Sequence, residues 1–378
     1  MTHTSAELRR ALVDKIATVN PALAPQWRDA VAAVDRALFI PPALYRPSGT
    51  LWEPVSRAAV GEEEWLRMVH SDRTWVTQVE GTDASDATGF LSGSPTSSAT
   101  LPSLVARTLH VANPRQGARV LEIGTGTGYS TAVLAHWVGA ENVVSVEYDP
   151  GCAAAAAGNL KNAGYSPTLV VGDGLQGHKE RADYDSIVAT CSVRSIPPSW
   201  LFQLADGGSI TVTISGWMLA AGMIRLVLDD NGAVTGRFMG DEVTYMLARP
   251  HERPPHPTFY RRDGRTRPTR VDPGLTQQWT GRFVAQLAAP SAELLATGDG
   301  LILWDVATGS QAWTEASNSG WRVHQHGPQS LWDQVEDALE AWQQHGAPDM
   351  AGFGMTATFE DQLVWLGHPG GPSWRLPA

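Results

Sequence analysis

Residues 120–130 read V-L-E-I-G-T-G-T-G-Y-S, and this stretch determines the fold that we predict. Its first apolar residues predict a short buried strand, and Thr131–Val138 has the pattern of a helix. Gly124, Gly126 and Gly128 lie between them, where glycine lets the backbone turn tightly and approach a ligand without a Cβ in the way. The first N–H groups of the helix then face that ligand. We therefore expect a strand, a glycine-rich loop and a helix at the start of a parallel α/β sheet.

Three further strands are predicted after this loop, over Val143–Val146, Thr168–Val171 and Tyr184–Ala189. Glu147 follows the first of them, about 20 residues beyond the glycines, and Asp173 follows the second. Open parallel sheets bind ligands at the carboxyl ends of their strands. A glycine loop alone also occurs at ordinary strand-to-helix turns, and the two carboxylates are what favour a ligand site here.

The acidic residue before the first glycine separates this loop from the dinucleotide fingerprint, which would predict NAD or FAD. The pattern E-I-G-T-G-T-G from Glu122 resembles the loop of class I S-adenosylmethionine methyltransferases. That resemblance implies S-adenosylmethionine as the cofactor, with Glu122 and the loop at its methionine part, Glu147 at the ribose and Asp173 at the adenine. The residues expected to bind the cofactor are Ser97, Glu122, Gly124, Thr125, Gly126, Gly128, Glu147, Asp173 and Gly174.

Length and composition limit the class of protein. The 378 residues suggest two domains, and 43% hydrophobic with 18% charged residues are globular values. No apolar run is long enough to cross a bilayer and no charged-then-apolar leader precedes Thr4, so we expect a cytoplasmic protein without a membrane partner. Cys152 and Cys191 are too few for a disulfide framework or a cysteine-built zinc site, and we expect no metal. A net charge of -11 disfavours a nucleic-acid partner, although residues 261–267 form a local basic run.

The region before the glycine loop is predicted in three parts. Ala6–Val19 and Trp27–Leu38 have helical patterns, while residues 45–89 are expected to be irregular apart from a short strand within residues 69–78. Hydroxyl side chains then crowd into residues 92–102, just before a predicted helix. Capping of that helix explains one of these hydroxyls but not five.

The order of these motifs resembles the protein L-isoaspartate O-methyltransferase family over about residues 8–248. The matching stretches are Leu38-Phe39-Ile40-Pro41, Asp72, residues 98–106, the glycine loop, Gly172-Asp173-Gly174, residues 184–188 and residues 204–210. By this resemblance Ser98 stands at the family's threonine, and Thr100 stands at the serine treated as its active-site residue. We therefore expect Ser98 and Thr100 to be catalytic, with an added methyl group on Thr100. Where repair enzymes have a G-A-A type stretch, residues 189–192 are bulkier, which could reshape the acceptor pocket.

Such a reaction places few demands on side chains. A carboxylate has a reference pKa near 4, so at pH 7 it is already ionised and needs no strong general base. The site has to hold one carboxylate oxygen in line with the sulfonium methyl group and exclude water. The hydroxyl groups of Ser98 and Thr100 suit that role because they orient a carboxylate without neutralising it.

The chain beyond the resemblance to repair enzymes has signals of its own. The expected fold is an α/β class I methyltransferase core of Rossmann-like type, with an N-terminal helical segment and a C-terminal α+β domain. Its expected boundaries are a helical segment and loop at 1–90, the core at 91–249, a proline-rich linker at 250–273 and an accessory domain at 274–378. This last part holds eight of the fifteen tryptophans, as core residues or as a peptide-binding surface: Trp279, Trp304, Trp313, Trp321, Trp332, Trp342, Trp365 and Trp374.

The extended form resembles isoaspartate-methyltransferase homologues associated with modified ribosomal peptides such as graspetides and lanthipeptides. The matching residues are Val76-Thr77-Gln78, residues 94–98, residues 327–332, Met355-Thr356-Ala357-Thr358 and Val364-Trp365-Leu366. The resemblance implies a cross-linked precursor peptide as partner, with esterification of an aspartate that then closes to an aspartimide. Two alternatives stay open: general L-isoaspartate repair, and a cofactor-binding peptide scaffold without turnover.

Overall fold

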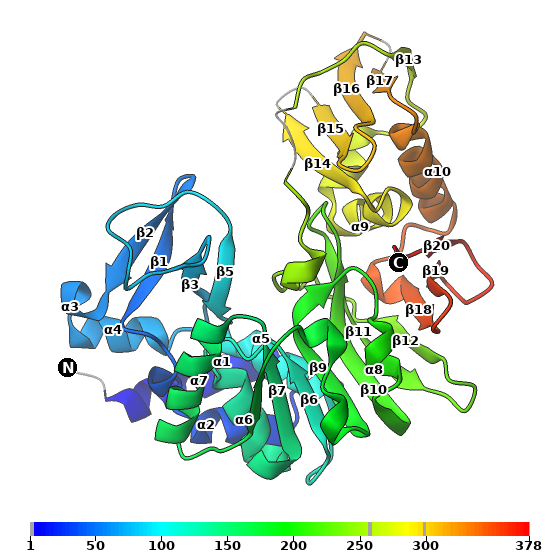
Figure 1. The fold of residues 1–378 in the computed structure, drawn as a ribbon. Helices are drawn as coiled ribbons and strands as arrows, with labels where there is room; N and C mark the ends of the chain where they lie inside the picture. Colours follow the sequence, from blue (N-terminus) through cyan, green and yellow to red (C-terminus); the bar gives the residue numbers. More distant parts are fainter. Residues whose placement is uncertain (1–3, 256–258, 298–299, 319, 378) are drawn as a thin grey trace. The chain divides into compact units, whose positions relative to one another are not determined.

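The computed structural model describes residues 4–255, 259–297, 300–318 and 320–377. The chain folds into two compact units (Figure 1). The first unit comprises residues 1–190 and 202–211, and the second comprises residues 191–201 and 212–378. Strands β9 (Tyr184–Val193) and β10 (Leu204–Ser215) therefore each contribute residues to both units. The expected boundaries at residues 90, 249 and 273 do not coincide with this division and stay a prediction. The start of the chain, where we expect no leader, lies outside the described residues up to residue 3.

A parallel sheet forms the centre of the first unit. Its strands are β6 (Val120–Ile123), β7 (Val143–Glu147) and β8 (Thr168–Val171), in the order β9-β6-β7-β8. The helices next to these strands in the chain are α5 (Pro102–Ala112), α6 (Tyr129–Val138) and α7 (Pro150–Asn162) (Figure 1). All four residues of β6 are buried, which explains its continuous apolar pattern. The strands predicted at 143–146, 168–171 and 184–189 are confirmed.

The N-terminal helices α1 (Ser5–Val19) and α2 (Pro25–Ala33) share a core with α6 that includes the fully buried Trp27. Of the two, α2 packs directly against α6, and α1 packs against α2. The Thr4 hydroxyl caps α1 together with Glu7, in a capping box. The predicted helix over Trp27–Leu38 ends earlier than expected. Val34 adopts an extended backbone, and a separate 3-10 turn, η1 (Arg36–Leu38), follows it.

The short strand predicted within residues 69–78 is present, but the prediction that the rest of residues 45–89 is irregular is wrong. This region forms most of a second sheet, whose elements are β1 (Ala43–Ser48), β2 (Leu51–Ser56), β3 (Trp75–Val79) and β4 (Thr82–Asp83), with helices α3 (Arg57–Val60) and α4 (Glu62–Val69). A fifth strand, β5 (Pro95–Ala99), pairs with β3 and carries the hydroxyl-rich segment into the sheet. The first hairpin was not predicted because its strands contain Pro47 and Pro54, and proline within an apolar run argues against a strand.

The second unit contains two groups of antiparallel strands and two longer helices. One group has the order β10-β11-β12-β18-β19-β20, and the other has the order β13-β17-β16-β15-β14. Their bounds are β11 (Ala221–Leu228), β12 (Val234–Phe238), β13 (Arg265–Pro268), β14 (Ala292–Thr297), β15 (Gly300–Asp305), β16 (Gln311–Ser317), β17 (Gly320–His326), β18 (Phe353–Ala357), β19 (Gln362–Leu366) and β20 (Ser373–Arg375), with α8 (Pro198–Leu201), α9 (Trp279–Ala288) and α10 (Leu331–Gln344). β13 lies within the predicted linker, and the closing hairpin of β18 and β19 pairs with β12.

Tryptophans in this unit mainly build its core. Trp304, Trp332, Trp342 and Trp365 are buried, so they are core residues and contribute little to any binding surface. The other four of the eight are half-buried. The prediction that most of these rings serve as core is confirmed for the four buried ones.

Acidic side chains of α10 neutralise part of the predicted basic run. Arg265 and Arg267 both pair with Asp333, and Arg267 also pairs with the buried Glu336 at 2.7 Å. Just beyond the run, Arg270 bonds the same Glu336 at 2.8 Å. These arginines are therefore bound within the unit and do not form an open phosphate-binding face. Within the described residues no helix is long and apolar enough to span a membrane, and no group of three or more potential metal ligands occurs.

Candidate functional site

The glycine loop between β6 and α6 needs its glycines for conformation and for space. Gly124, Gly126 and Gly128 have φ values of 93°, 54° and 88°, in the left-handed region that other residues rarely adopt. A Cβ on Gly124 would lie 2.8 Å from the hydroxyl oxygen of Thr190, and one on Gly128 would lie 3.2 Å from Leu160. The loop is therefore held in one tight conformation, as the sequence predicts for a ligand-binding turn.

Glu122, at the end of β6, is the centre of a buried hydrogen-bond network. Its carboxylate is fully buried and accepts hydrogen bonds from the hydroxyls of Ser130 (2.6 Å), Thr131 (2.5 Å) and Ser145 (2.7 Å). Because Ser145 donates its only proton to Glu122, the hydroxyl of the loop residue Thr125, 2.6 Å away, must donate to Ser145. Burial raises the pKa of Glu122, and the three hydroxyl donors oppose that shift.

This network changes the interpretation of two predicted cofactor contacts. Glu122 was expected at the methionine part of the cofactor, but both of its oxygens are already bonded to side chains on α6 and β7. Thr125 is also buried and directs its hydroxyl into the same network. In this structure Glu122 and Thr125 stabilise the shape of the loop from its buried side. Their predicted contact with a ligand stays a prediction.

Glu147 lies beside the glycine loop, as the parallel topology predicts. One of its carboxylate oxygens accepts from the Gly126 N–H at 2.8 Å, and the other accepts from Asp149 N–H at 3.0 Å. Glu147 is half-buried, so the carboxylate also has an accessible side. A carboxylate at this place can bond the hydroxyls of a ribose.

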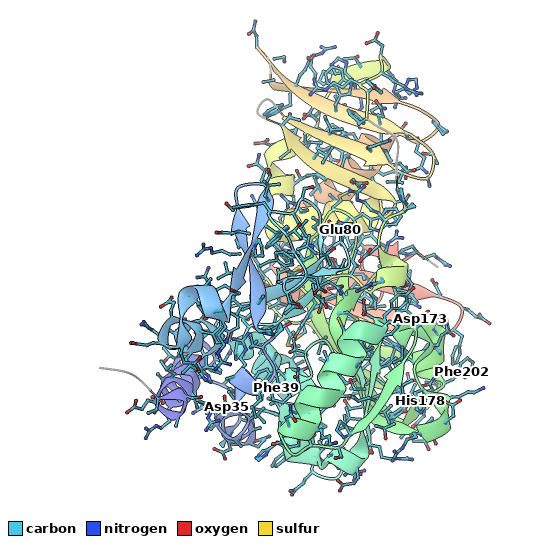
Figure 2. The ribbon with its side chains drawn as sticks, turned by 60° about the vertical axis from the view of Figure 1, so that its left-hand side comes forward. Asp35, Phe39, Glu80, Asp173, His178 and Phe202 are labelled. Atoms are coloured by element: carbon cyan, nitrogen blue, oxygen red, sulfur yellow. The ribbon has the colours of Figure 1, made fainter. Side chains whose placement is uncertain are left out.

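Asp173 and Gly174 follow the end of β8 (Figure 2). The Asp173 carboxylate accepts from the N–H of Leu175 at 2.9 Å and begins a 3-10 turn, η3 (Gly174–Gln176). A Cβ on Gly174 would lie 2.5 Å from Ile123 Cγ2, so only glycine allows this close approach to the end of β6. Gly172, just before this turn, donates its N–H to the Glu147 carbonyl at 2.9 Å. Asp173 and Glu147 thus follow adjacent strands at the same edge of the sheet.

The hydroxyl-rich strand β5 passes next to the loop. The carbonyl oxygen of Ser98 lies 3.6 Å from the position that a Cβ on Gly126 would take. The preceding residue, Ser97, is buried and hydrogen-bonds the thiol of Cys152 near the start of α7. Burial raises the pKa of Cys152 to about 11, so this thiol is a neutral packing group at pH 7 and no nucleophile. The backbone of Ser98 therefore lies near the glycine loop, and the catalytic roles expected for Ser98 and Thr100 stay a prediction.

Two residues that support this site were not identified from the sequence. Thr190, at the end of β9 within the first unit, donates its hydroxyl to the carbonyls of Ile123 and Gly124. Within the bulkier stretch at 189–192, Thr190 therefore stabilises the glycine loop through hydrogen bonds. Arg36 is the second, with 1% exposure, and it donates to the carbonyl of Thr100. A charged residue on an apolar turn gives no sequence signal of such burial.

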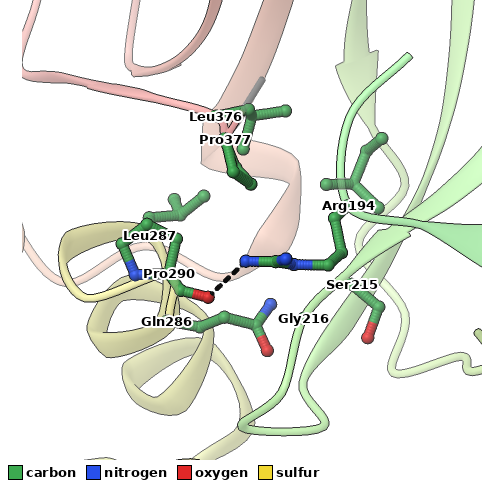
Figure 3. A pocket seen from close by; sticks show the side chains of 9 residues that line it. Arg194, Ser215, Gly216, Gln286, Leu287, Pro290, Leu376 and Pro377 are labelled. Carbon is green, nitrogen blue, oxygen red and sulfur yellow. Dashed lines mark hydrogen bonds between the residues drawn. The ribbon is translucent and has the colours of Figure 1, made fainter. Parts of the chain in front are cut away.

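A separate pocket lies within the second unit and contains none of the predicted site residues (Figure 3). Arg194, Gln286 and Pro290 contribute to its walls. Arg194 donates to the Pro290 carbonyl at 2.7 Å and stacks 3.8 Å from the ring centre of Trp217. Gln286 donates to the Ala220 carbonyl at 2.9 Å. These contacts give Arg194 and Gln286 structural roles in the second unit.

Known proteins resemble part of this chain in sequence. Residues 73–246 match the family model described as Protein-L-isoaspartate(D-aspartate) O-methyltransferase (PCMT). The protein-L-isoaspartate O-methyltransferase of Ignicoccus hospitalis is 40% identical over 115 residues, which are 30% of this chain and 54% of the relative. Protein-L-isoaspartate O-methyltransferase 1 of Archaeoglobus fulgidus is 45% identical over 115 residues, 30% of this chain and 53% of the relative. The chain thus spans about half the length of the curated relatives that it matches.

A solved structure resembles the whole fold. This structure, of a protein-L-isoaspartate O-methyltransferase, aligns with 95% of this chain and 100% of its own, with a TM-score of 0.55 and 20% sequence identity. At this identity the likeness shows the fold alone. The predicted class I S-adenosylmethionine methyltransferase fold, with additional N- and C-terminal regions, is confirmed. The resemblance to the family is confirmed for the matched residues, whereas the subtype associated with ribosomal peptides stays a prediction.

Proposed function

We propose that this protein methylates a carboxylate of a peptide with S-adenosylmethionine as the methyl donor, because residues 73–246 match the family model of protein-L-isoaspartate O-methyltransferases. The observation that carries the proposal is the position of β5. The carbonyl of Ser98 lies 3.6 Å from the Cβ position of Gly126, so the expected acceptor segment adjoins the expected cofactor loop. A methyl transfer needs these two groups to be side by side.

The residues at the sheet edge fit S-adenosylmethionine, which supplies an electrophilic sulfonium methyl group when bound. The glycine loop leaves space where a Cβ would intrude, and the half-buried carboxylate of Glu147 bonds the loop amide of Gly126. Glu147 would accept hydrogen bonds from the ribose hydroxyls, and Asp173 would accept from the adenine amino group. Gly174 keeps the end of β8 close enough to β6 for both contacts. Glu122 and Thr125 fix the loop from its buried side.

The acceptor side of the site orients a group that is already charged. The hydroxyls of Ser98 and Thr100 donate to one oxygen of the peptide carboxylate, and the other oxygen forms a bond to the methyl carbon as the carbon–sulfur bond breaks. A negative carboxylate and a positive sulfonium become a neutral ester and a neutral thioether, so no proton has to move. Because the reaction needs no general base, hydroxyl side chains on the acceptor strand are sufficient.

As the finer substrate class we propose an aspartate in a modified, cross-linked ribosomal peptide. The next backbone nitrogen of that peptide attacks the ester carbonyl, its proton leaves with methoxide as methanol, and an aspartimide results. Methylation makes this closure feasible because methoxide leaves more readily than oxide. The support for this class is the motif resemblance at Val76-Thr77-Gln78, a segment of β3 that pairs directly with the acceptor strand β5.

General repair of L-isoaspartyl peptides is the second candidate. One observation favours it: the solved protein whose fold resembles 95% of this chain is a protein-L-isoaspartate O-methyltransferase. A second unit of this kind is therefore compatible with that activity as well. In this case the acceptor is the free α-carboxylate of an isoaspartyl residue, and the same hydroxyls orient it.

Mass spectrometry of two peptides separates the candidates. The protein is incubated with S-adenosylmethionine and either a cross-linked precursor encoded near its gene or a plain isoaspartyl peptide. Esterification would add about 14 Da to the precursor, and imide closure with loss of methanol would then leave it about 18 Da lighter than the unmodified precursor. Both changes together would support the proposed reaction. A gain on the isoaspartyl peptide alone would support repair. If the protein bound the cofactor but modified neither peptide, both candidate activities would be contradicted. A cofactor-binding peptide scaffold without turnover would then be the remaining alternative.

A further inference from the structure

One fully buried cation in the first unit contacts the acceptor segment. Arg36 is 1% exposed, and its guanidinium donates only to backbone carbonyls. The five acceptors are Val69 (2.8 Å), Ser71 (2.9 Å), Arg73 (3.0 Å), Ala99 (3.1 Å) and Thr100 (3.0 Å). Figure 2 marks Asp35 and Phe39, which lie on either side of the turn η1 that carries Arg36. The neighbouring carboxylate, Asp35, pairs instead with Arg9 at 3.4 Å and lies 3.6 Å from His70.

Three segments distant in sequence meet at this side chain. Residues 69–73 comprise the end of α4 and the start of its link to β3, and Ala99 and Thr100 are the last residue of β5 and the first residue after it. Two further side chains reinforce the same junction. The Asp72 carboxylate accepts from the N–H of Ser103 at 2.9 Å, and the Thr74 hydroxyl accepts from the N–H of Leu101 at 3.1 Å. The backbone from residue 99 to residue 103 is thus held at four places by residues 36, 72 and 74.

Arg36 also contacts the helix that begins the cofactor side of the site. Its guanidinium carbon lies 5.9 Å from the ring centre of Tyr129, the first residue of α6 after Gly128. Phe39 packs edge-on against the same ring, with 5.9 Å between the ring centres. Arg36 therefore lies between the end of the acceptor strand and the start of the helix behind the glycine loop.

The energetics explain why this position needs arginine. A buried cation is costly unless its charge is compensated, and here five carbonyl dipoles provide that compensation. Burial lowers the pKa of Arg36 to about 10, so the side chain stays charged at neutral pH. Lysine has three donors on one nitrogen and cannot reach two groups of carbonyls on opposite sides, whereas the planar fork of arginine can.

We propose that Arg36 is a positioning residue for methyl transfer: it fixes the backbone at Thr100 relative to the glycine loop, and so sets the distance between acceptor carboxylate and methyl group. This inference rests on the proposed carboxyl methylation. Misplacement by about 1 Å is enough to lower a transfer rate on the order of 100-fold. Arg36 acts through Thr100 and touches neither cofactor nor acceptor.

A double-mutant cycle tests the proposal. We expect Arg36→Lys to lower kcat by about 10-fold or more while S-adenosylmethionine binding, measured by calorimetry, changes by less than about twofold. In a Thr100→Ala background, Arg36→Lys should cost less than about threefold, because the group that it positions is already gone. The matched control is Arg28→Lys on the neighbouring helix α2, which gives up a carbonyl bond to Pro21 and should keep wild-type kcat.

The proposal would be overturned if the kcat losses of the two single variants multiplied fully in the double variant. It would also be overturned if Arg36→Lys weakened S-adenosylmethionine binding as much as it lowered kcat. If Arg36→Lys does not fold, Thr74→Val is used in the same cycle, since it releases the Leu101 N–H from the same segment. If the wild type methylates no peptide, the proposed function fails, and amide hydrogen exchange decides on Arg36 separately. Arg36→Lys should then speed exchange at Leu101 and Ser103 but not in residues 120–131, and unchanged exchange at 101 and 103 would refute the positioning role.

Discussion

Replacing Glu122 tests whether the residue at the end of β6 shapes the glycine loop or contacts the cofactor. The carboxylate accepts three hydroxyl protons, from Ser130, Thr131 and Ser145, at 2.5 to 2.7 Å. Glu122→Ala leaves these three buried donors without their acceptor. At about 1 kcal/mol for each unmet hydroxyl, the free energy of unfolding should fall by about 3 kcal/mol.

Glu122→Gln should be much milder. The amide keeps one oxygen acceptor, and its NH2 group faces a hydroxyl that can rotate to accept. The variant loses charge-assisted bonds but also removes a buried charge, so we expect a net loss of about 1 kcal/mol. Ser145→Ala is a matched control, because it deletes a single donor and should also cost about 1 kcal/mol. Since the loop keeps its shape in Glu122→Gln, cofactor affinity should stay close to that of the wild type.

The pH dependence provides a second readout with a defined sign. Burial raises the pKa of Glu122 above its ordinary value of 4.5, so the folded protein binds this proton more tightly than the unfolded chain. The stabilising contribution of the protonated form is complete below the unfolded pKa and is lost as pH rises through the folded pKa. Glu122→Gln has no such group, and its stability relative to the wild type should therefore improve between pH 4.5 and neutrality.

Urea unfolding followed by tryptophan fluorescence measures these differences, provided that the slopes with urea agree among the variants. The positioning role of Glu122 would be refuted if Glu122→Ala cost less than about 1 kcal/mol, because its hydroxyl partners would then have found other acceptors. A direct cofactor role would be supported instead if Glu122→Gln kept its stability but lost binding by calorimetry.

The remaining predictions concern other parts of the first unit. Asp173→Ala should weaken S-adenosylmethionine binding, and wild-type affinity by calorimetry would remove the adenine contact from the proposal. Thr190→Val removes the hydroxyl that holds the loop carbonyls of Ile123 and Gly124, and we expect a loss of about 1 kcal/mol in urea unfolding together with weaker cofactor binding. Burial lowers the pKa of His70 below its ordinary value of 6.5, so the unfolded chain binds this proton more tightly than the folded protein. The free energy of unfolding should therefore rise as the pH increases towards 6.5 and level off above it. A flatter profile in His70→Gln, by thermal unfolding at pH 5 and 7, would confirm the source of that slope.

The parallel strands were predictable because local sequence determines them. β7 and β8 are short, mostly apolar runs that end at Glu147 and just before Gly172, and such runs predict strands of a parallel sheet. The hairpin of β1 and β2 lacked that signal. Its strands contain Pro47 and Pro54 and are only partly buried, so their pairing depends on neighbours that pattern analysis does not include. Likewise, the hairpin at the C-terminus was predicted, but its pairing with β12, more than 100 residues earlier, was not.

The site shows the same division between local and distant information. Glycine positions and strand-end carboxylates are local, and Gly126 and Glu147 do lie in hydrogen-bond contact. The interpretation of Glu122 required knowledge of Ser145, which is 23 residues away in the chain. Arg36 required still more, because its role depends on carbonyls that any sequence possesses. A backbone acceptor has no identity in the sequence, so a residue that binds only backbone groups cannot be recognised before the fold is known.

The two sides of the proposed site are held by different sets of residues, and this separation has a mechanistic consequence. The cofactor side depends on Glu122, Thr190 and Glu147, which fix the loop from the parallel sheet. The acceptor side depends on Arg36, which fixes the end of β5 from the N-terminal region. Changes in the first set that disturb the shape of the loop should lower cofactor affinity, and changes in the second should alter the rate at saturating cofactor. A variant of Arg36 that impaired binding and left the rate intact would show that the two sides are one rigid support, and the assignment of separate roles would have to be abandoned.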